Sequence, residues 1–383
     1  MTTASRGKAA AQSSTQINPP YAAVSVQTYW ENYNSNLRGK FEGATFKKRN
    51  LQRMCDHIDA CFTVGANPLP VKLICFPEFS IGGLYTPRTT TQEVKRWQAI
   101  TMPGPETEVL AKKAREYDIY IAACNHENDP AVPDNFFNTA FIISPKGKII
   151  LKYRKLNTAF SCDPHDIYDK YVNPITGTRD FFPVVDTKIG RLACFICGDI
   201  QIPEIPRMYA IKGAEVLCHL NSGYAGELPR QVLRVRAWDN TIYIVEENWA
   251  ARVLATEPLD GTRISISYDS RGGGQAMVID FLGNVIAQAD DKTPQLVQGM
   301  INIMALRDAR TRMRRGALPG DAVPMTRTEL YKPFYSKTIF PPNQVLVDGP
   351  MKTHNDASVL KRRQTAVENR LKCMDYYSED SVK

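Results

Sequence analysis

The chain has 383 residues, 43% of them hydrophobic and 23% charged, which is enough to bury a substantial core in one large domain. Its 48 basic and 40 acidic residues give a net charge of +8, but they are scattered along the chain, and this distribution disfavours a nucleic-acid-binding protein. No apolar run approaches the length of a membrane-spanning helix, and residues 1–20 lack the apolar segment of a signal peptide or anchor.

The predicted elements alternate between strands and helices along the chain. In the first half, strands are expected at residues 21–28, 71–76, 119–124, 137–143 and 148–154, with helices at 45–64 and from a turn at 103–107 through 117. In the second half, strands are expected at 182–186, 191–196, 216–220, 243–247, 275–280, 285–289 and 296–301, with helices at 203–212, 228–240 and 306–314. This alternation predicts an α/β layered domain with mixed sheets.

Three segments differ in composition. Residues 1–20 are rich in Ala, Ser, Thr and Gln and read as a flexible leader, and residues 21–318 form the folded domain. From 319 to 383 prolines interrupt the chain and long apolar runs are few, which is compatible with partial disorder or with an extended arm. We expect an arm that wraps around a partner subunit, because this segment carries large apolar side chains that need to be buried, namely Tyr331, Phe334, Tyr335, Ile339 and Phe340.

The nine cysteines do not form a disulfide or zinc pattern. Cys194 and Cys197 are spaced as C-x-x-C, but neither a second pair nor a pair of histidines follows at metal-ligand spacing. Most of the thiols are therefore expected to be small buried hydrophobes in a reducing environment, which favours a cytoplasmic protein.

Three polar residues end predicted strands in the same way. Glu78 follows the strand at 71–76, Lys155 follows the strand at 148–154, and Cys197 follows the strand at 191–196, with a glycine directly behind it. Sites in mixed α/β sheets are built at the carboxyl ends of strands. If the fold gathers the three, they supply a base, a cation that stabilises developing negative charge, and a nucleophile.

The motifs around these residues resemble those of the nitrilase superfamily of carbon–nitrogen hydrolases, and most of all its aliphatic amidase and formamidase branch. The matching segments run in family order over roughly residues 20 to 315: Phe76-Pro77-Glu78-Phe79, Pro103-Gly104-Pro105-Glu106-Thr107, Asn138-Thr139-Ala140, Lys152-Tyr153-Arg154-Lys155, Cys197-Gly198-Asp199 with Pro203-Glu204, Lys212-Gly213-Ala214-Glu215, Arg236-Ala237-Trp238-Asp239-Asn240 and Arg307-Asp308-Ala309-Arg310.

The resemblance implies a four-layer α-β-β-α sandwich and a carboxamide hydrolase that works through a Cys thioester. By that resemblance Glu78 is the general base, Lys155 stabilises the tetrahedral intermediate, Cys197 is the nucleophile, and the N–H of Gly198 lies near the oxyanion. No metal or organic cofactor is implied.

One departure from the family pattern concerns a second carboxylate. The amidase branch has a glutamate eight positions after the catalytic lysine, where this chain has Asp163. Because the segment may carry an insertion, His165 and Asp166 are alternatives for the same place. A shorter carboxylate displaces the charge by about one C–C bond, which argues against a simple short aliphatic amide as substrate.

Other residues near predicted strand ends are candidates for the substrate pocket or for ordinary packing. They are Tyr85, Phe160, Asn221, Tyr224 and Trp249. His126 and His219 also end strands, and two unlinked histidines more often serve structure than metal binding.

Alternative functions remain open. An N-carbamoyl amide hydrolase or a nitrilase would use the same three residues, although Gly198-Asp199 stands where nitrilases usually carry Trp-Glu. A catalytically inactive interaction subunit is the non-enzyme alternative. Family members associate through the helices after the nucleophile, so we expect a homo-oligomer, a dimer or higher, with the C-terminal arm adding contacts.

Overall fold

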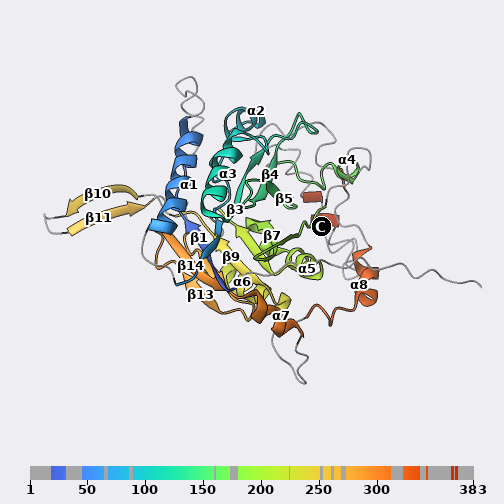
Figure 1. The fold of residues 1–383 in the computed structure, drawn as a ribbon. Helices are drawn as coiled ribbons and strands as arrows, with labels where there is room; N and C mark the ends of the chain where they lie inside the picture. Colours follow the sequence, from blue (N-terminus) through green and yellow to red (C-terminus); the bar gives the residue numbers. More distant parts are fainter. Residues whose placement is uncertain are drawn as a thin grey trace, which may run out of the picture.

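The computed structural model describes residues 19–31, 45–63, 68–85, 89–158, 161–172, 180–223, 225–250, 253–259, 263–268, 273–311, 322–336, 342–343, 364–365 and 367–369. Within these ranges the chain forms two six-stranded mixed sheets and a two-stranded hairpin (Figure 1). Most predicted strands are present, three of them, at residues 137–143, 216–220 and 243–247, with the expected bounds.

The first sheet has the strand order β14-β1-β2-β3-β4-β5. Its strands are β1 (Tyr21–Gln27), β2 (Val71–Cys75), β3 (Tyr120–Glu127), β4 (Phe137–Ile143), β5 (Ile149–Arg154) and β14 (Gln295–Ile301). β1, β2 and β3 are parallel neighbours, whereas β3-β4, β4-β5 and β1-β14 are antiparallel. The turn at residues 145–147 joins β4 to β5, as the sequence predicts.

The second sheet has the order β13-β12-β9-β8-β7-β6. Its strands are β6 (Val185–Thr187), β7 (Gly190–Ile196), β8 (Val216–Leu220), β9 (Tyr243–Glu247), β12 (Met277–Ile279) and β13 (Val285–Gln288). β7, β8 and β9 run parallel, so their carboxyl ends lie at one edge of the sheet.

Helices cover the outer faces of both sheets. α1 (Thr45–Thr63) and α3 (Pro105–Tyr117) contact the first sheet, and α5 (Glu204–Ile211) and α6 (Glu227–Asn240) contact the second (Figure 1). Along β2 and the residue after it, successive side chains point to opposite faces of the sheet. Leu73 and Cys75 pack into the core between the sheets, while Ile74 and Phe76 pack under the helices. The predicted α-β-β-α sandwich is confirmed.

The two sheets approach each other closely where β14 passes β12. A Cβ placed on Gly299 would lie 2.5 Å from Cβ of Val278, which is closer than two carbon atoms can pack. The glycine in β14 is therefore required by the neighbouring sheet.

Several elements were not predicted. They are the short α2 (Thr91–Glu93), the π-helix η2 (Val94–Gln98), the short α4 (Tyr168–Val172), the hairpin of β10 (Val253–Leu259) and β11 (Arg263–Tyr268), and α8 (Thr328–Tyr335). The expected strand at 182–186 was misplaced, since β6 begins only at Val185. The expected helix at 306–314 starts earlier, because α7 spans Ile303–Thr311.

Within the predicted C-terminal arm, residues 328–335 form the helix α8, which the sequence did not predict. Within this one chain Tyr331, Phe334 and Tyr335 of α8 are exposed, so their burial against a partner subunit stays a prediction. The expected burial of Ile339 and Phe340 lies outside the described residues.

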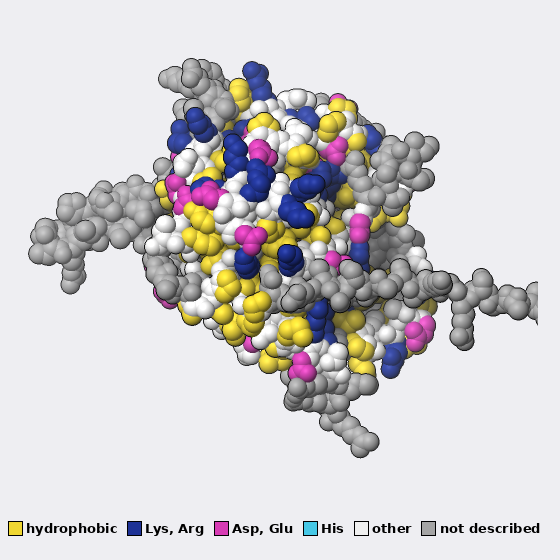
Figure 2. All heavy atoms as spheres, viewed as in Figure 1, with side chains coloured by type: hydrophobic (Ala, Val, Ile, Leu, Met, Phe, Trp, Pro, Cys, Tyr) yellow, Lys and Arg dark blue, Asp and Glu magenta, His cyan; other side chains and the backbone are white. Residues whose placement is uncertain are grey.

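The visible surface mixes side chains of all kinds. Figure 2 shows basic side chains interspersed with acidic and hydrophobic ones on one face of the molecule. Among the helices of the described residues, none combines the length and apolar composition needed to span a bilayer.

Candidate active site

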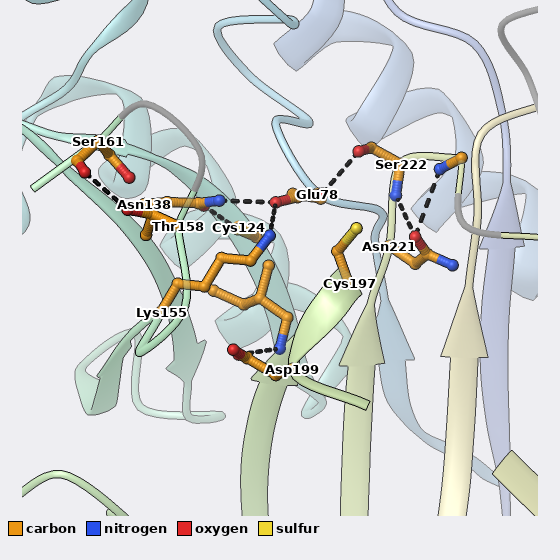
Figure 3. Close-up of polar contacts among 12 residues, drawn as sticks. Glu78, Cys124, Asn138, Lys155, Thr158, Ser161, Cys197, Asp199, Asn221 and Ser222 are labelled. Atoms are coloured by element: carbon orange, nitrogen blue, oxygen red, sulfur yellow. Dashed lines mark hydrogen bonds and ion pairs between the residues drawn. The ribbon is translucent and has the colours of Figure 1, made fainter. Parts of the chain in front are cut away.

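The fold brings the three strand-end residues together. Glu78 lies three residues beyond β2, while Lys155 and Cys197 directly follow β5 and β7, so the first sheet supplies the carboxylate and the ammonium and the second supplies the thiol. In Figure 3 the three side chains point toward one another. Lys155 Nζ lies 3.0 Å from Glu78 Oε1.

The carboxylate of Glu78 is almost fully buried and is held by three donors. Oε1 accepts hydrogen bonds from Asn138 Nδ2 at 2.6 Å and from Lys155 Nζ, and Oε2 accepts from the hydroxyl of Ser222 at 2.6 Å. The indole N–H of Trp249 fixes the backbone by donating to the Glu78 carbonyl at 2.8 Å. These contacts restrict the carboxylate to one orientation.

Lys155 is positioned by the edge of β4. Its backbone N–H donates to the carbonyl of Asn138 at 2.9 Å and so extends the β4-β5 ladder by one residue. Burial by itself would lower the pKa of the Lys155 ammonium, but the surrounding acidic groups, Glu78 foremost, together raise that pKa. Lys155 is therefore a fixed positive charge in the site.

Cys197 starts the 3-10 helix η3 (Cys197–Gln201), and its φ of 46° puts the backbone in the left-handed region. Such a conformation is unusual for a residue with a side chain, and it marks functional sites in many proteins. The eight described cysteines are all free; seven are buried, and Cys197 alone among them is partly exposed. This distribution agrees with the expected role of most thiols as core residues.

The thiol of Cys197 is protonated at neutral pH. Burial, and after it the charge of Glu78, raises the pKa of Cys197 to about 12, against the opposing effects of Lys155 and of the Gly198 N–H. A nucleophilic attack by this sulfur therefore needs a base that removes the proton during the reaction, and Glu78 is the neighbouring carboxylate.

Asp199 holds the first turn of η3. Its Oδ2 accepts hydrogen bonds from the hydroxyl of Tyr153 at 2.7 Å and from the N–H of Ile196 at 3.0 Å. Burial raises the pKa of this carboxyl to about 6, although Lys155 and Tyr153 pull in the other direction.

A buried network connects the backbone of Cys197 to the supports of Glu78. His219 Nε2 lies 2.9 Å from the Cys197 carbonyl, and Nδ1 contacts the carboxylate of Glu246. Glu246 Oε1 accepts from Asn221 Nδ2 at 2.9 Å, and the Asn221 carbonyl accepts from the N–H of Glu78 at 3.2 Å. Base and nucleophile are thus tied through β8 and β9.

The predicted pocket residues fall in different places. Asn221 and Trp249 support Glu78, as described above, and Tyr85 packs its ring against Phe79 and His126. Phe160 and Tyr224 lie outside the described residues.

Asp163 is engaged in its own loop. Its Oδ1 accepts hydrogen bonds from the N–H groups of His165 at 2.9 Å and Asp166 at 3.1 Å, and its own N–H donates to Asp166 Oδ2. Burial first, and then the neighbouring Asp166, raise the pKa of the Asp163 carboxyl well above its usual range. Its role toward a substrate stays a prediction.

His126 contrasts with His219. The ring of His219 has two partners, but neither ring nitrogen of the fully buried His126 has a hydrogen-bond partner within the described part of the chain. The expectation of a satisfied structural histidine therefore holds for His219 and was wrong for His126.

Sequence reasoning assigned no role to three residues that hold the site, namely Asn138, Ser222 and Glu246. Asn138 and Ser222 lie 60 and 144 residues from Glu78 along the chain. The sequence signal that could have found Asn138 and Ser222 is their place near strand ends. Asn138 is the second residue of β4, and Ser222 lies two residues after the end of β8.

No group of three or more His, Cys, Asp or Glu side chains among the described residues is arranged to hold a metal ion.

Comparison with known proteins identifies the family. The family model for carbon-nitrogen hydrolases matches residues 34–311. The chain belongs to this family. Formamidases from Bacillus thuringiensis (strain Al Hakam) and Bacillus anthracis are each 38% identical to this carbon–nitrogen hydrolase over 184 residues, which are 47% of this chain and 51% of theirs. The chain thus spans about half the length of the curated relatives it matches.

Solved structures share the fold. Nit3 of Saccharomyces cerevisiae, a member of branch 10 of the nitrilase superfamily, has a TM-score of 0.57 and 20% identity, covering 78% of this chain and 97% of its own. A variant of the amidase from Nesterenkonia sp. AN1, with the acetamide moiety of fluoroacetamide added covalently at its active site cysteine, has a TM-score of 0.53 and 17% identity, covering 82% and 96%. At these identities the likeness establishes the architecture.

Proposed function

We propose that this carbon–nitrogen hydrolase cleaves a carboxamide with water into a carboxylate and ammonia, through a thioester on Cys197. The observation that carries the proposal is the convergence of a carboxylate, an ammonium and a thiol, with Lys155 Nζ 3.0 Å from Glu78 Oε1 and Cys197 beside them. The formamidase relatives and the cysteine adduct in the Nesterenkonia amidase variant support the same chemistry.

In the first half of the reaction, Glu78 removes the thiol proton while Cys197 Sγ attacks the carbonyl carbon of the amide. The resulting oxyanion is stabilised by the ammonium of Lys155 and by the N–H of Gly198 at the start of η3. Glu78 then passes its proton to the amide nitrogen, the C–N bond breaks, and ammonia leaves. The acyl group remains on Cys197 as a thioester.

In the second half, Glu78 removes a proton from water, and the hydroxide oxygen attacks the thioester carbonyl. The second tetrahedral intermediate uses the same two stabilising groups. The C–S bond breaks, the proton returns from Glu78 to the sulfur, and the carboxylic acid leaves. Glu78 takes up and releases a proton in each half, four transfers in all, and the three donors that hold its carboxylate keep it in position for them.

An ammonia-release assay tests the proposal. The substrates are formamide, short aliphatic amides, aryl amides, carbamoyl amino acids and nitriles, and the variants are Cys197→Ala and Glu78→Gln. We expect both variants to lose about 10³-fold or more in kcat. Cys194→Ala is the matched control, because that thiol lies three residues earlier, fully buried in β7. Undiminished amide hydrolysis by Cys197→Ala contradicts the proposal. If the wild-type protein acts on nitriles alone, it is a nitrilase and the proposed amide hydrolysis is wrong.

Oligomer formation is a second part of the proposal. Large apolar side chains are exposed on the helices that follow Cys197: Ile211 on α5, Val235 and Trp238 on α6, and Phe334 and Tyr335 on α8. Large apolar side chains exposed on these helices are available to a protein partner, and a second copy of the chain fits the expectation from the sequence. Sedimentation velocity tests it, with Trp238→Glu expected to shift the particle toward the monomer.

The domain bounds at residues 21 and 318 and the cytoplasmic location remain predictions. Limited proteolysis followed by mass spectrometry tests the bounds, and fractionation of cells that express the full chain tests the location.

A further inference from the structure

His126 lies beside the candidate active site with its hydrogen-bonding capacity unused. Its side chain is fully buried near the end of β3, and neither ring nitrogen finds a partner among the described residues. Buried polar groups nearly always have partners, because an unmet donor or acceptor is costly. Because His126 lies next to the proposed reacting groups, a bound substrate could supply the missing hydrogen-bond partner.

The register of the first sheet places His126 next to the support of the proposed base. In the antiparallel pairing of β3 and β4, His126 lies opposite Asn138, and residues so paired have Cβ atoms about 5 Å apart on the same face. Asn138 donates to Glu78 Oε1 at 2.6 Å. Cys124, two residues earlier on that face, contacts Asn138 Oδ1 at 3.1 Å.

Three aromatic rings surround the imidazole. Its ring centroid lies 4.5 Å from Phe79, 5.1 Å from Phe136 and 5.7 Å from Tyr85. Phe79 directly follows Glu78 with a φ of 62°, and Tyr85 is the partly exposed ring of the set. We call Phe79, Tyr85, His126 and Phe136 the aromatic box.

The imidazole in the aromatic box is neutral. Burial, assisted by the positive charge of Lys155, lowers the pKa of His126 to about 3. A neutral imidazole offers one N–H donor and one acceptor. A charged group brought into this apolar box would lose its hydration, and the charges nearby, those of Lys155 and Glu78, already pair with each other, whereas a neutral polar group meets a partner in the imidazole.

We propose that the aromatic box binds the acyl half of the substrate, with His126 bonded to a neutral hydrogen-bonding group such as a hydroxyl on the acyl chain. The rings of Phe79, Tyr85 and Phe136 pack against the carbon atoms that carry this group. The inference rests on the proposed amide hydrolysis and narrows its substrate class from carboxamides in general to hydroxylated ones.

Matched substrate pairs test the inference. The probes are 2-hydroxypropionamide and 3-hydroxypropionamide, each compared with propionamide, and the readout is the ratio of kcat/KM within each pair. We expect the wild-type protein to favour at least one hydroxyamide by about tenfold, the value of one good hydrogen bond. In His126→Phe, which keeps a ring and removes both nitrogens, the ratio falls to about one.

His57→Phe is the matched control. His57 lies on α1, and its Nε2 is bonded to Thr28 Oγ1 at 2.9 Å, so this variant is expected to keep the wild-type ratio. A wild-type ratio near one for both hydroxyamides, or an unchanged ratio in His126→Phe, overturns the inference. If His126→Phe does not fold, as judged by thermal unfolding, His126→Leu and the binding measurement below replace it.

Calorimetric binding to Cys197→Ala separates this inference from the proposed function. Tighter binding of a hydroxyamide than of propionamide, by about tenfold, supports the aromatic box even if the wild-type protein hydrolyses no amide. In that case the proposed hydrolysis fails and the binding site stands. Equal binding of all three amides removes the aromatic box as a determinant of specificity.

Discussion

His219 donates its Nε2–H to the carbonyl oxygen of Cys197 over 2.9 Å, and so holds the residue whose backbone is left-handed. A carbonyl can only accept, so Nε2 must carry a proton. Nδ1 contacts the carboxylate of Glu246. Burial alone would lower the pKa of His219, but the charge of Glu246 and its hydrogen bond raise it, and the net shift is upward. The pair therefore fixes the turn that presents the thiol, which makes His219 a positioning residue.

We expect His219→Leu to lower kcat by about 10- to 100-fold with little change in KM, because a small displacement of a nucleophile is enough for such a loss. Glu246→Gln should stay within a few-fold of wild type. A glutamine can donate to Nδ1 while it still accepts from Asn221, and Nε2 keeps its proton for Cys197.

Steady-state kinetics and thermal unfolding of both variants check this expectation. Loss of the His219 ring leaves the Glu246 carboxylate buried and unpaired, so unfolding must be monitored to separate instability from misplacement. Full kcat in folded His219→Leu, or a loss in Glu246→Gln as large as in His219→Leu, contradicts a geometric role.

The close contact between the sheets gives a prediction about stability. We expect Gly299→Ala to reduce the free energy of unfolding by about 1–3 kcal/mol, because its Cβ would lie 2.5 Å from that of Val278. Urea unfolding measures the change. Val278→Ala in the same chain keeps its Cβ but removes the two Cγ atoms, which would lie 2.7 and 2.9 Å from the new methyl group, so it should recover part of the loss. Strictly additive effects of the two substitutions would show that these groups do not interact.

The order of the core elements could be predicted because buried apolar residues recur about every second residue in a strand and about every 3.6 residues in a helix. A polar residue follows each of β2, β5 and β7, which made Glu78, Lys155 and Cys197 candidates, and the resemblance to a family then joined them in one site. The hairpin of β10 and β11 was missed, since Pro258 within an alternating run argues against a strand.

The supports of the site could not be predicted, because they join residues that are distant along the chain. Asn138 and Ser222 reach Glu78 from two different sheets, and only the packing of those sheets decides that they do. His126 was misjudged for a related reason. Sequence shows a histidine at a strand end, but whether its nitrogens find partners depends on Phe79, Tyr85 and Phe136 around it.

Asp199 predicts a pH dependence of stability. Burial raises the pKa of its carboxyl from 3.8 to about 6 in the folded protein, so between these values the folded state binds more protons than the unfolded state. Stability from this group is fully present below pH 4 and is lost as the pH rises through 6. At pH 8 the loss amounts to about 3 kcal/mol.

Asp199→Asn should therefore gain stability relative to wild type as the pH rises from 4 to 6, and keep that gain at pH 8. The amide oxygen can still accept from Tyr153 and from the N–H of Ile196, so the turn is preserved. Chemical unfolding at pH 4, 6 and 8 measures the difference. The quantity to compare is the free energy of unfolding of Asp199→Asn minus that of wild type. An effect of the substitution that does not depend on pH adds the same amount at each pH, so only the change of this difference with pH matters. A difference that is the same at pH 4 and pH 8 contradicts the raised pKa.

The protonated thiol of Cys197 predicts how the site responds to alkylation. In Glu78→Gln the base is gone, but burial, the main cause of the raised pKa, remains. Labelling of Cys197 by iodoacetamide in this variant should be slow at pH 7 and should rise about tenfold per pH unit through pH 10, since the thiolate is the reactive form. In wild type Glu78 removes the proton during the attack, so labelling is faster at pH 7 and depends less on pH.

Mass spectrometry of the peptide that contains Cys197 follows the reaction, and the Cys197→Ala protein supplies the background from the other thiols. A plateau below pH 8.5 in Glu78→Gln would mean that Lys155 and the Gly198 N–H already hold a thiolate. In that case Glu78 would not be needed to activate the sulfur, and its role in the proposed reaction would be limited to moving protons to the leaving nitrogen and from water.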